Sequence, residues 1–237
     1  MVEHVGQSLP LAGRRVLIAT PGCPDINGLQ AGLQHLGADC ALLASVEDFI
    51  SLSAIETAFA EAERALGGFD ALVLAVGNSL NRESRPLASL SVDQWKSACL
   101  DPLRTTRHCL QGAWRTLAGR PASIVLIGPN ISLTGAPGLV ALSALSEGQR
   151  GLMKSAARQW GTQGIRLNWL GVDARVFAGE LAAAELAQSP EMGTPAPALG
   201  SAPDLSSGVA HSVAMLIGAH ALTGASIPVD GGFWMVP

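Results

Sequence analysis

Short, continuously apolar runs alternate along this chain with longer stretches whose apolar residues recur at helical spacing. The apolar runs predict buried strands at residues 15–20, 40–43, 71–76, 123–127, 165–170 and 225–229, with Gly128 and Pro129 ending the fourth. The longer stretches predict helices at residues 29–36, 55–66, 92–117 and 142–160. Fully apolar strands that alternate with helices predict a parallel sheet covered on both faces.

We therefore expect a Rossmann-type, doubly wound α/β fold of about seven strands, with helices on both faces in three αβα layers. Residues 1–237 suit a single domain of this kind. Residues 174–208, rich in Pro, Gly, Ser and Ala toward their end, predict a variable loop region over the ligand end of the sheet. Pro102 lies inside the helix expected at residues 92–117 and should disturb it.

Charge and cysteine content narrow the possible functions. The formal net charge is −4, which argues against a nucleic acid partner, and no apolar stretch reaches the ~18 residues that span a bilayer. The first residues lack a basic segment followed by an apolar one, so we expect no signal peptide and a cytoplasmic location. The four cysteines show no CxxC spacing and predict buried free thiols without a metal site: Cys23, Cys40, Cys99 and Cys109.

Six segments, in order and with consistent spacing, resemble the short-chain dehydrogenase/reductase family. Five of them are Leu11–Val16, Leu66–Val73, Trp95 with Leu103, Gly164–Asn168 and Leu222–Gly232. The sixth, Pro137–Ser146, resembles the family's Pro-Gly-x-x-x-Tyr-x-x-x-Lys segment, with Leu142 at the tyrosine and Ser146 at the lysine. The whole chain contains no tyrosine. The resemblance implies the Rossmann-type fold and places the chemistry in question.

The resemblance implies four catalytic positions, and none of them carries the family's residue. Leu142 has no proton to transfer, and Ser146 has no positive charge that could stabilise a phenolate. Counting along the chain puts Pro129 at the family's serine and Pro102 at its asparagine. We expect the nearby polar residues to lie on solvated or packing faces, or without a base beside them: Ser132, Ser143, Glu147, Lys154 and His108.

The resemblance also implies NAD(P) as cofactor, held by a Thr-Gly-x-x-x-Gly-x-Gly loop after the first strand. Here the three glycine positions are Pro21, Asp25 and Asn27. Pro21 has no backbone N–H. Asp25 would set a carboxylate beside the pyrophosphate, at a cost of about 4 kcal/mol. A loop shifted onto Gly22 or Gly28 remains an alternative.

The other cofactor positions depart from the family in the same way. The second strand leads into Ala44, which offers neither an acid for a ribose nor a base for a 2′-phosphate. The family's Asn-Asn-Ala-Gly begins here with Leu74 and Ala75, and its later Pro-Gly is Val172 and Asp173. We therefore expect no bound cofactor.

These residues predict a non-catalytic family member that serves as a structural or regulatory subunit. It would pair with an active paralogue or with a second copy, as a dimer or tetramer, through residues 92–117, 142–160 and 209–237. The apolar tail at residues 233–237 would bury against a neighbouring subunit, with folding back on its own core as the alternative.

The resemblance implies that mixed active and inactive assemblies occur in this family and act on hydroxyacyl or ketoacyl substrates. One is 2-[hydroxy(phenyl)methyl]succinyl-CoA dehydrogenase, whose inactive subunit this chain resembles without a motif that specifies it. Two other functions stay open: a small-molecule binding module that uses the vacated apolar cleft, and an NAD(P)-dependent oxidoreductase or lyase with relocated catalytic groups.

Overall fold

Six parallel strands form one sheet in the order β2-β1-β3-β4-β5-β6. The computed structural model describes residues 8–23, 26–43, 49, 51–133, 135–178 and 197–235. The strands are β1 (Arg15–Ala19), β2 (Asp39–Leu43), β3 (Ala71–Ala75), β4 (Ala122–Pro129), β5 (Ile165–Val172) and β6 (Ser226–Pro228). Every pair of neighbours runs parallel, which confirms the doubly wound α/β fold.

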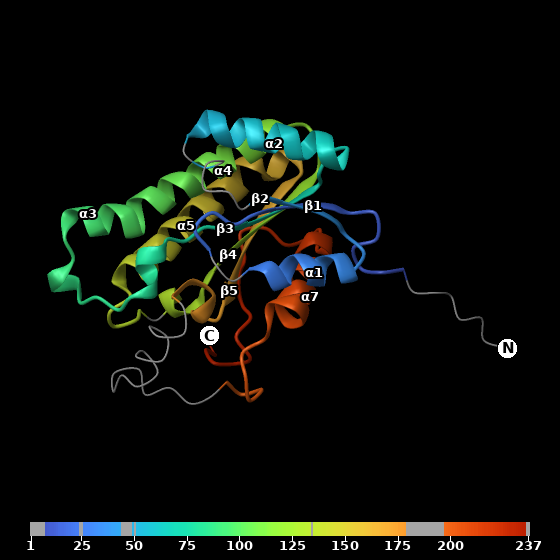
Figure 1. The fold of residues 1–237 in the computed structure, drawn as a ribbon. Helices are drawn as coiled ribbons and strands as arrows, with labels where there is room; N and C mark the ends of the chain where they lie inside the picture. Colours follow the sequence, from blue (N-terminus) through green and yellow to red (C-terminus); the bar gives the residue numbers. More distant parts are fainter. Residues whose placement is uncertain are drawn as a thin grey trace.

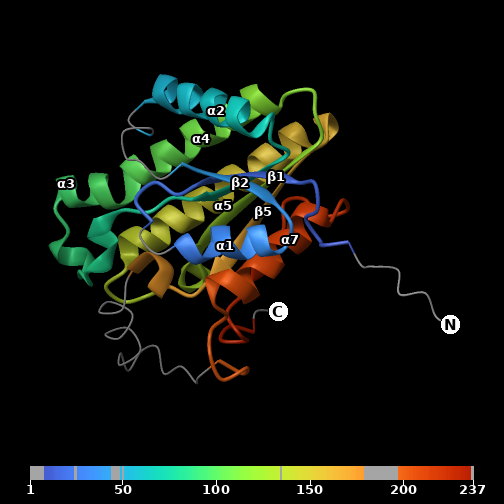
Figure 2. The ribbon, with the colours of Figure 1, turned by 45° about the vertical axis from the view of Figure 1, so that its right-hand side comes forward.

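Helices cover both faces of this sheet (Figures 1 and 2). On one face lie α2 (Leu52–Leu66), α4 (Asp101–Leu117) and α5 (Val140–Trp160), and on the other lie α1 (Asn27–His35) and α7 (Ala210–Gly218). Successive strand residues point to opposite faces, so β1 to β5 each contribute to two apolar cores, and β6 contributes Ile227 to one of them. The three expected αβα layers are therefore present.

Shorter helical segments connect these elements. They are the 3-10 turns η2 (Ser79–Arg82), η3 (Leu87–Ser89), η5 (Asn130–Leu133) and η6 (Gly161–Gln163), the short helix α3 (Val92–Trp95), and the π-helical turns η4 (Lys96–Leu100) and η7 (Leu205–Val209). No helix within the described ranges has both the length and the apolar character needed to cross a membrane.

The described residues form six strands with β2 at one end of the order, where about seven strands were expected. Residues 44–48 and 50, between β2 and α2, lie outside the described residues. Within the described residues β2 pairs with β1 alone, and its residues are half-buried or exposed.

Two other expected boundaries differ from the structure. Gly128 and Pro129 do not end the fourth strand but belong to β4, where they pair with Gly171 and Val172 of β5. In the region expected to be a loop at residues 174–208, residues 175–178 and 205–208 are helical, while residues 179–196 lie outside the described residues.

The helix expected at residues 92–117 is divided by the π turn η4, directly before Pro102. Proline has no N–H, so it cannot bond to the carbonyl of Ala98, four residues earlier. The side chain of buried Asn81 donates to that carbonyl instead, at 3.3 Å. The proline thus disturbs the helix, as predicted, and the π turn together with Asn81 accommodates it.

Replacing Asn81 by alanine should lower the free energy of unfolding by about 1–2 kcal/mol, because it removes a buried hydrogen bond to the Ala98 carbonyl. Urea unfolding followed by tryptophan fluorescence measures the change. In a Pro102→Ala background the helix supplies an N–H at that position, so Asn81→Ala should cost less than half as much. An equal cost in both backgrounds would show that this hydrogen bond does not compensate for the proline.

Buried Asp230 holds the C-terminal segment in place. It accepts hydrogen bonds from Asn130 Nδ2 at 2.8 Å and from three backbone N–H groups at 3.0–3.2 Å, those of Gly232, Phe233 and Trp234. Asn130 directly follows β4, so this carboxylate joins the end of the chain to the carboxyl end of the sheet.

The apolar tail divides between the two alternatives left open by its sequence. Phe233 and Trp234 are half-buried and pack edge to face with their ring centres 5.3 Å apart, so this part folds back on its own chain. Met235 is 78% exposed and remains available to a neighbour. Val236 and Pro237 lie outside the described residues.

Candidate functional site

The chain leaves β1 through a tight turn formed by Thr20, Pro21, Gly22 and Cys23. The Cys23 N–H donates to the Thr20 carbonyl at 3.2 Å, and Gly22 has a φ of +67°. Proline followed by a glycine with positive φ is typical of a type II turn. The sequence carries this signal, but comparison with the family's glycine pattern alone missed it.

This turn packs directly against the loop that follows β3. The Gly77 N–H donates to the Pro21 carbonyl at 3.0 Å, and a Cβ at Gly22 would overlap the Gly77 carbonyl oxygen. The Phe177 ring, which is 2% exposed, lies beside Gly77. Strand order reverses between β1 and β3, and doubly wound sheets bind ligands at such a point. Here the two loops touch there, with Phe177 packed beside them.

The helical residues 175–178 bring Phe177 to this position. They follow β5 directly, and Cys23 Sγ lies 3.6 Å from the Val176 carbonyl, so the segment rests on the turn after β1. The start of the region predicted to be a variable loop therefore packs into the end of the sheet. Sequence reasoning missed Phe177, whose position depends on this contact between segments far apart in the chain.

Gly28, which was offered for a shifted phosphate loop, and Gly32 lie on the side of α1 that packs against η7. A Cβ at Gly32 would overlap the Ser206 carbonyl oxygen, and one at Gly28 would lie 3.5 Å from Leu205 Cβ. Gly32 therefore lets α1 approach η7 closely, and Gly28 lies against the same turn at ordinary contact distance. Together with the place of Gly22 in the type II turn, this packing does not favour the shifted-loop alternative.

Of the remaining cofactor positions, three are buried in the core, and the charge of Asp173 is paired with that of Arg175. Leu74, Ala75 and Val172 are each at most 1% exposed. The Asp173 carboxylate accepts hydrogen bonds from the backbone N–H of Arg175 at 2.8 Å and from its Nε at 2.9 Å. Two predicted positions, Asp25 and Ala44, fall outside the described residues, and for Asn27 the structure describes only the backbone at the start of α1.

The residues at the four catalytic positions are all buried in the interior of the protein. Leu142 and Ser146 lie on the inner side of α5 and are 1% and 0% exposed. Pro102 is buried near the start of α4, and Pro129 ends β4 beside Val172. The Ser146 hydroxyl has no hydrogen-bond partner within the described part of the chain.

A buried glutamine that sequence reasoning missed joins these elements. Gln149 follows Ser146 by three residues on the same side of α5 and is 3% exposed. Its Nε2 donates to the Val76 carbonyl at 3.2 Å and to Thr106 Oγ1 at 3.0 Å, and Thr106 donates to the Pro102 carbonyl at 2.9 Å. These bonds fasten α5 to α4 and to the end of β3.

The other polar candidates do not form a nucleophile with a base. Ser132 donates to the Pro129 carbonyl at 3.2 Å, and the Ser143 hydroxyl is buried without a hydrogen-bond partner. Glu147 is exposed and pairs with Arg150 at 2.6 Å, and Lys154 is exposed. In the described ranges, no three His, Cys, Asp or Glu residues are grouped so as to hold a metal.

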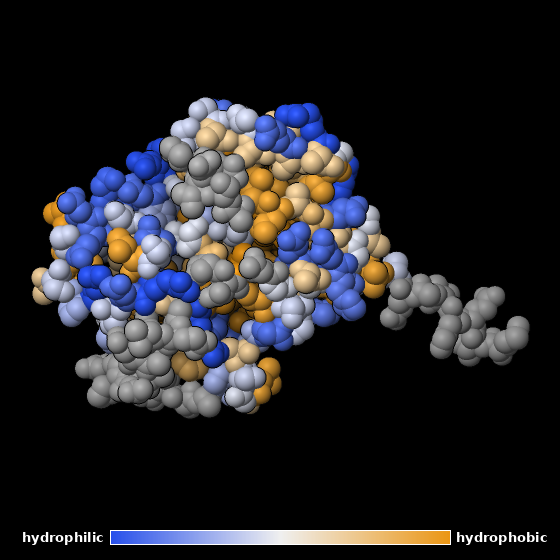
Figure 3. Space-filling view, in the orientation of Figure 1, coloured by the Kyte–Doolittle hydropathy of each residue, from blue (hydrophilic) through white to orange (hydrophobic). Residues whose placement is uncertain are grey.

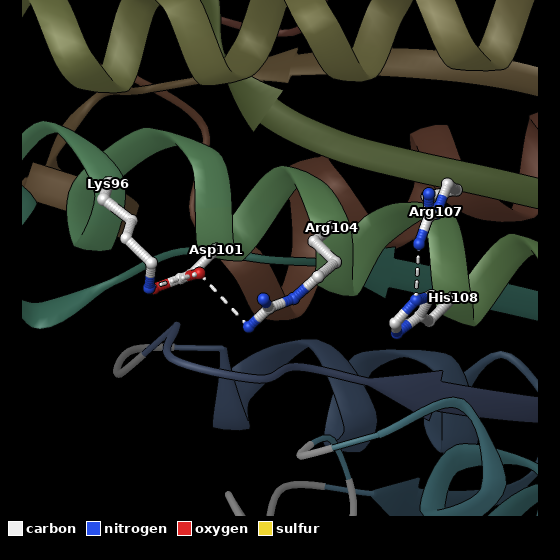
Figure 4. A network of polar contacts seen from close by, with 5 residues as sticks. All are labelled: Lys96, Asp101, Arg104, Arg107 and His108. Atoms are coloured by element: carbon white, nitrogen blue, oxygen red, sulfur yellow. Dashed lines mark hydrogen bonds and ion pairs between the residues drawn. The ribbon is translucent and has the colours of Figure 1, made fainter.

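His108 belongs to a row of polar contacts along α4, shown in Figure 4. Its Nε2 lies 2.7 Å from Arg107 Nη2. Partial burial and then the charges of Arg107 and Arg104 lower the pKa of His108. The lower pKa favours the neutral imidazole, which can accept a hydrogen bond from Arg107. This geometry fits the packing or interface role expected of His108.

The cysteines are all free, as predicted, and three of them are buried. Burial raises the pKa of Cys99 and Cys109, and burial together with the Asp39 charge raises that of Cys40 to about 11. Each of these thiols is therefore protonated at neutral pH and is a poor nucleophile.

A cavity of about 10 Å³ lies beside Leu142. Apolar side chains form much of its wall, including Leu80, Leu139 and Ala141. This volume accommodates about one water molecule. A larger pocket of about 320 Å³ lies at the opposite, amino ends of the strands, between Arg14, Asp70 and other residues.

The chain matches a family model described as Enoyl-(Acyl carrier protein) reductase over residues 12–234. It is 28% identical over 233 residues to the 3-oxoacyl-[acyl-carrier-protein] reductase of Rattus norvegicus, covering 98% of this chain and 89% of that protein. It is also 33% identical over 116 residues to the short-chain dehydrogenase/reductase eriH of Hericium erinaceus, covering 48% of this chain and 45% of that protein.

Solved structures share the fold. The NADH-dependent enoyl-[acyl-carrier-protein] reductase of Aquifex aeolicus has a TM-score of 0.80 at 18% identity, covering 96% of this chain and 99% of that one. The 3-ketoacyl-(acyl-carrier-protein) reductase of Brucella melitensis, solved with NADH, has a TM-score of 0.79 at 16% identity, covering 95% and 100%. Since the family model spans nearly the whole chain, this protein belongs to the short-chain dehydrogenase/reductase family, close to its enoyl and 3-oxoacyl reductases.

Proposed function

We propose that this chain is a non-catalytic family member, a structural or regulatory subunit of an oligomeric dehydrogenase for hydroxyacyl or ketoacyl thioesters. The observation that carries the proposal is the packing at the catalytic positions. Leu142 and Ser146 stand where the family has its tyrosine and lysine, and their side chains are 1% and 0% exposed. The names of its relatives, reductases of acyl groups on acyl carrier protein, support the thioester class.

The described residues do not fit the family's cofactor. Pro21 has no N–H that could donate to a phosphate. Its carbonyl oxygen accepts a hydrogen bond from the Gly77 N–H. The contact between Gly22 and Gly77, with Phe177 packed beside it, joins the two loops between which a ligand would bind, and this supports the proposed lack of cofactor binding. We therefore infer no reaction step that involves NAD(P) on this chain.

The outer surfaces of α4, α5 and the C-terminal segment remain available for assembly. Gly151 lies exposed on α5 with open space around its missing Cβ, so no contact within this chain requires a glycine there. Glycine inside a helix costs about 1 kcal/mol relative to alanine, a cost that the close approach of another helix would explain. Apolar residues at the same surfaces are also exposed: Leu100, Trp114, Leu199 and Met235.

Neither alternative function gains support from the described residues. A cavity of about 10 Å³ beside Leu142 does not suit a small-molecule binding module at the old active site. Relocated catalysis would need a nucleophile or acid with a matching base, and the described side chains around Ser146 do not provide one.

Purification of the tagged chain from its native host tests the proposal. We expect a stoichiometric complex with a family member that retains Tyr-x-x-x-Lys, and dehydrogenase activity that a tyrosine-to-phenylalanine change in that partner abolishes. Ser146→Ala in this chain should leave the activity of the complex within about twofold, since the hydroxyl contacts no substrate. Reduction or oxidation of an acyl thioester by this chain alone would overturn the proposal.

A further inference from the structure

The pocket of about 320 Å³ at the amino ends of the strands has the size of a small ligand site. Residues at the beginnings of three strands line it: Asp70 precedes β3, Ser123 begins β4 and Arg166 begins β5. Arg14, before β1, and His220, after α7, complete its polar wall. In Figure 3 hydrophilic residues are also frequent on the right-hand side, where Figure 1 draws the amino end of β1. This end of the sheet thus combines a ligand-sized pocket with charged side chains.

Arg14 contributes a guanidinium group whose N–H donors have no acceptor within the described part of the chain. Its Nη1 lies 3.9 Å from Asp70 Oδ1, a distance that is too long for a hydrogen bond. The side chain is partly exposed and forms part of the pocket wall. A ligand in the pocket can therefore accept hydrogen bonds from Arg14 without displacing any that the protein makes there.

Arg166 adds a second positive charge, which the protein balances only in part. Its Nη1 donates to the carbonyls of Leu216 at 2.9 Å and Ala219 at 2.8 Å, and its Nη2 to that of Ile217 at 2.7 Å. These acceptors lie at the end of α7, and the partial charge of a helix end offsets about half a unit charge. Burial and then the charge of Arg14 lower the pKa of Arg166, but a guanidinium stays protonated at neutral pH. Two positive charges therefore lie near each other at this pocket.

Asp70 alone among the lining residues carries a carboxylate, and few of its acceptor sites are in use. Its Oδ1 accepts no hydrogen bond from the described residues, and its Oδ2 accepts only a long one, from the Arg15 N–H at 3.5 Å. A carboxylate can accept about four hydrogen bonds, and the Asp70 side chain is 24% exposed. A hydroxyl or ammonium group on a ligand can therefore donate to it. One carboxylate does not balance two guanidinium groups, so the pocket favours an anion.

We propose that this pocket binds a small organic acid that also carries a hydroxyl or ammonium group. The carboxylate of the ligand accepts hydrogen bonds from Arg14, in the positive field of Arg166, because charge-assisted bonds of this kind are strong. The hydroxyl or ammonium group of the ligand donates to Asp70. This site lies at the opposite ends of the strands from the crevice of the family's cofactor, so it does not depend on the proposed function.

Three acids with the same carbon skeleton test the proposal: L-lactate carries a hydroxyl group, L-alanine an ammonium group and propionate neither. Ligand-observed NMR titrations of the full chain at constant ionic strength measure the three dissociation constants. We expect lactate or alanine to bind with a Kd of about 1 mM, at least about tenfold more tightly than propionate. The tighter of the two distinguishes a hydroxy acid from an amino acid. No binding up to about 20 mM, or equal binding of all three acids, would overturn the inference.

Arg14→Gln locates the binding site on the protein. It should weaken binding of the tighter acid at least about tenfold and leave the thermal unfolding midpoint nearly unchanged, because Arg14 donates no hydrogen bond to the described residues. Arg64→Gln is the matched control: it removes an exposed cation on α2, across the sheet from α7, and should change binding less than about twofold. Equal binding by the wild type and Arg14→Gln would place the ligand elsewhere and refute the assignment.

Two substitutions of Asp70 test the second half of the site. Asp70→Asn removes the charge and keeps the size, so alanine should lose its preference over propionate to less than about threefold. Asp70→Ala removes the acceptor altogether, so lactate should lose its preference in the same way. Thermal unfolding confirms that each variant is folded. A preference for the tighter acid that survives both substitutions would contradict the proposed contact with Asp70.

Discussion

Ser146→Lys, which restores the family's lysine, should lower the free energy of unfolding by about 3–5 kcal/mol. Ser146 is fully buried, and Gln149, on the same side of α5, already bonds to Val76 and Thr106. An ammonium group placed there is buried without a counter-ion, which costs several kcal/mol in measured cases. Urea unfolding followed by tryptophan fluorescence measures the loss.

Ser146→Ala is the matched control. The serine hydroxyl is buried without a hydrogen-bond partner among the described residues, so its removal should leave stability unchanged or raise it by about 1 kcal/mol. If Ser146→Lys were tolerated at wild-type stability, the position would be open to solvent, as in a working active site. That result would contradict the packed interior on which the proposed function depends.

Asp230→Ala should lower the free energy of unfolding by about 3 kcal/mol. The carboxylate accepts one side-chain and three backbone hydrogen bonds, and its removal leaves these donors without an acceptor at a site only 4% exposed. Because these bonds hold residues 232–234, protease cleavage near the C-terminus should also accelerate. Chemical unfolding and limited proteolysis measure the two effects.

Asp204→Ala tests whether the burial of Asp230 matters. Asp204 also accepts hydrogen bonds from neighbours, Ser206 and Ser207, but it lies at the exposed start of η7. Its replacement should cost much less stability and leave the C-terminal segment protected. Equal effects of the two substitutions would mean that Asp230 contributes no more than an ordinary surface carboxylate.

The strands and helices were predictable because each has a local pattern of apolar and polar residues in the sequence. Strands buried on both faces, such as β1 and β3, require continuous apolar runs, and those runs were found at the right places. The apolar runs number six and match the six described strands, whereas the expectation of about seven came with the family resemblance. The disturbance of the helix at Pro102 was predicted. The hydrogen bond from Asn81 to the Ala98 carbonyl was not, because it joins residues seventeen positions apart.

From the sequence, the site could be predicted only as a set of family positions that carry other residues. The sequence identifies Leu142 and Ser146 as unsuited to acid–base chemistry, whereas their burial follows from tertiary packing. Gln149 could have been found from its spacing to Ser146 on one side of α5. Phe177 could not, because its place beside Gly77 depends on how the segment after β5 folds onto two distant loops.

Calorimetric titration of the wild-type chain with NADH and NADPH tests the central claim most directly. We predict no binding of either cofactor up to about 1 mM, because Pro21, the contact of Gly22 with Gly77 and the buried Phe177 ring leave the crevice unsuited to a pyrophosphate. An intact family member titrated in parallel confirms that the assay detects binding. A dissociation constant in the micromolar range for this chain would contradict the account.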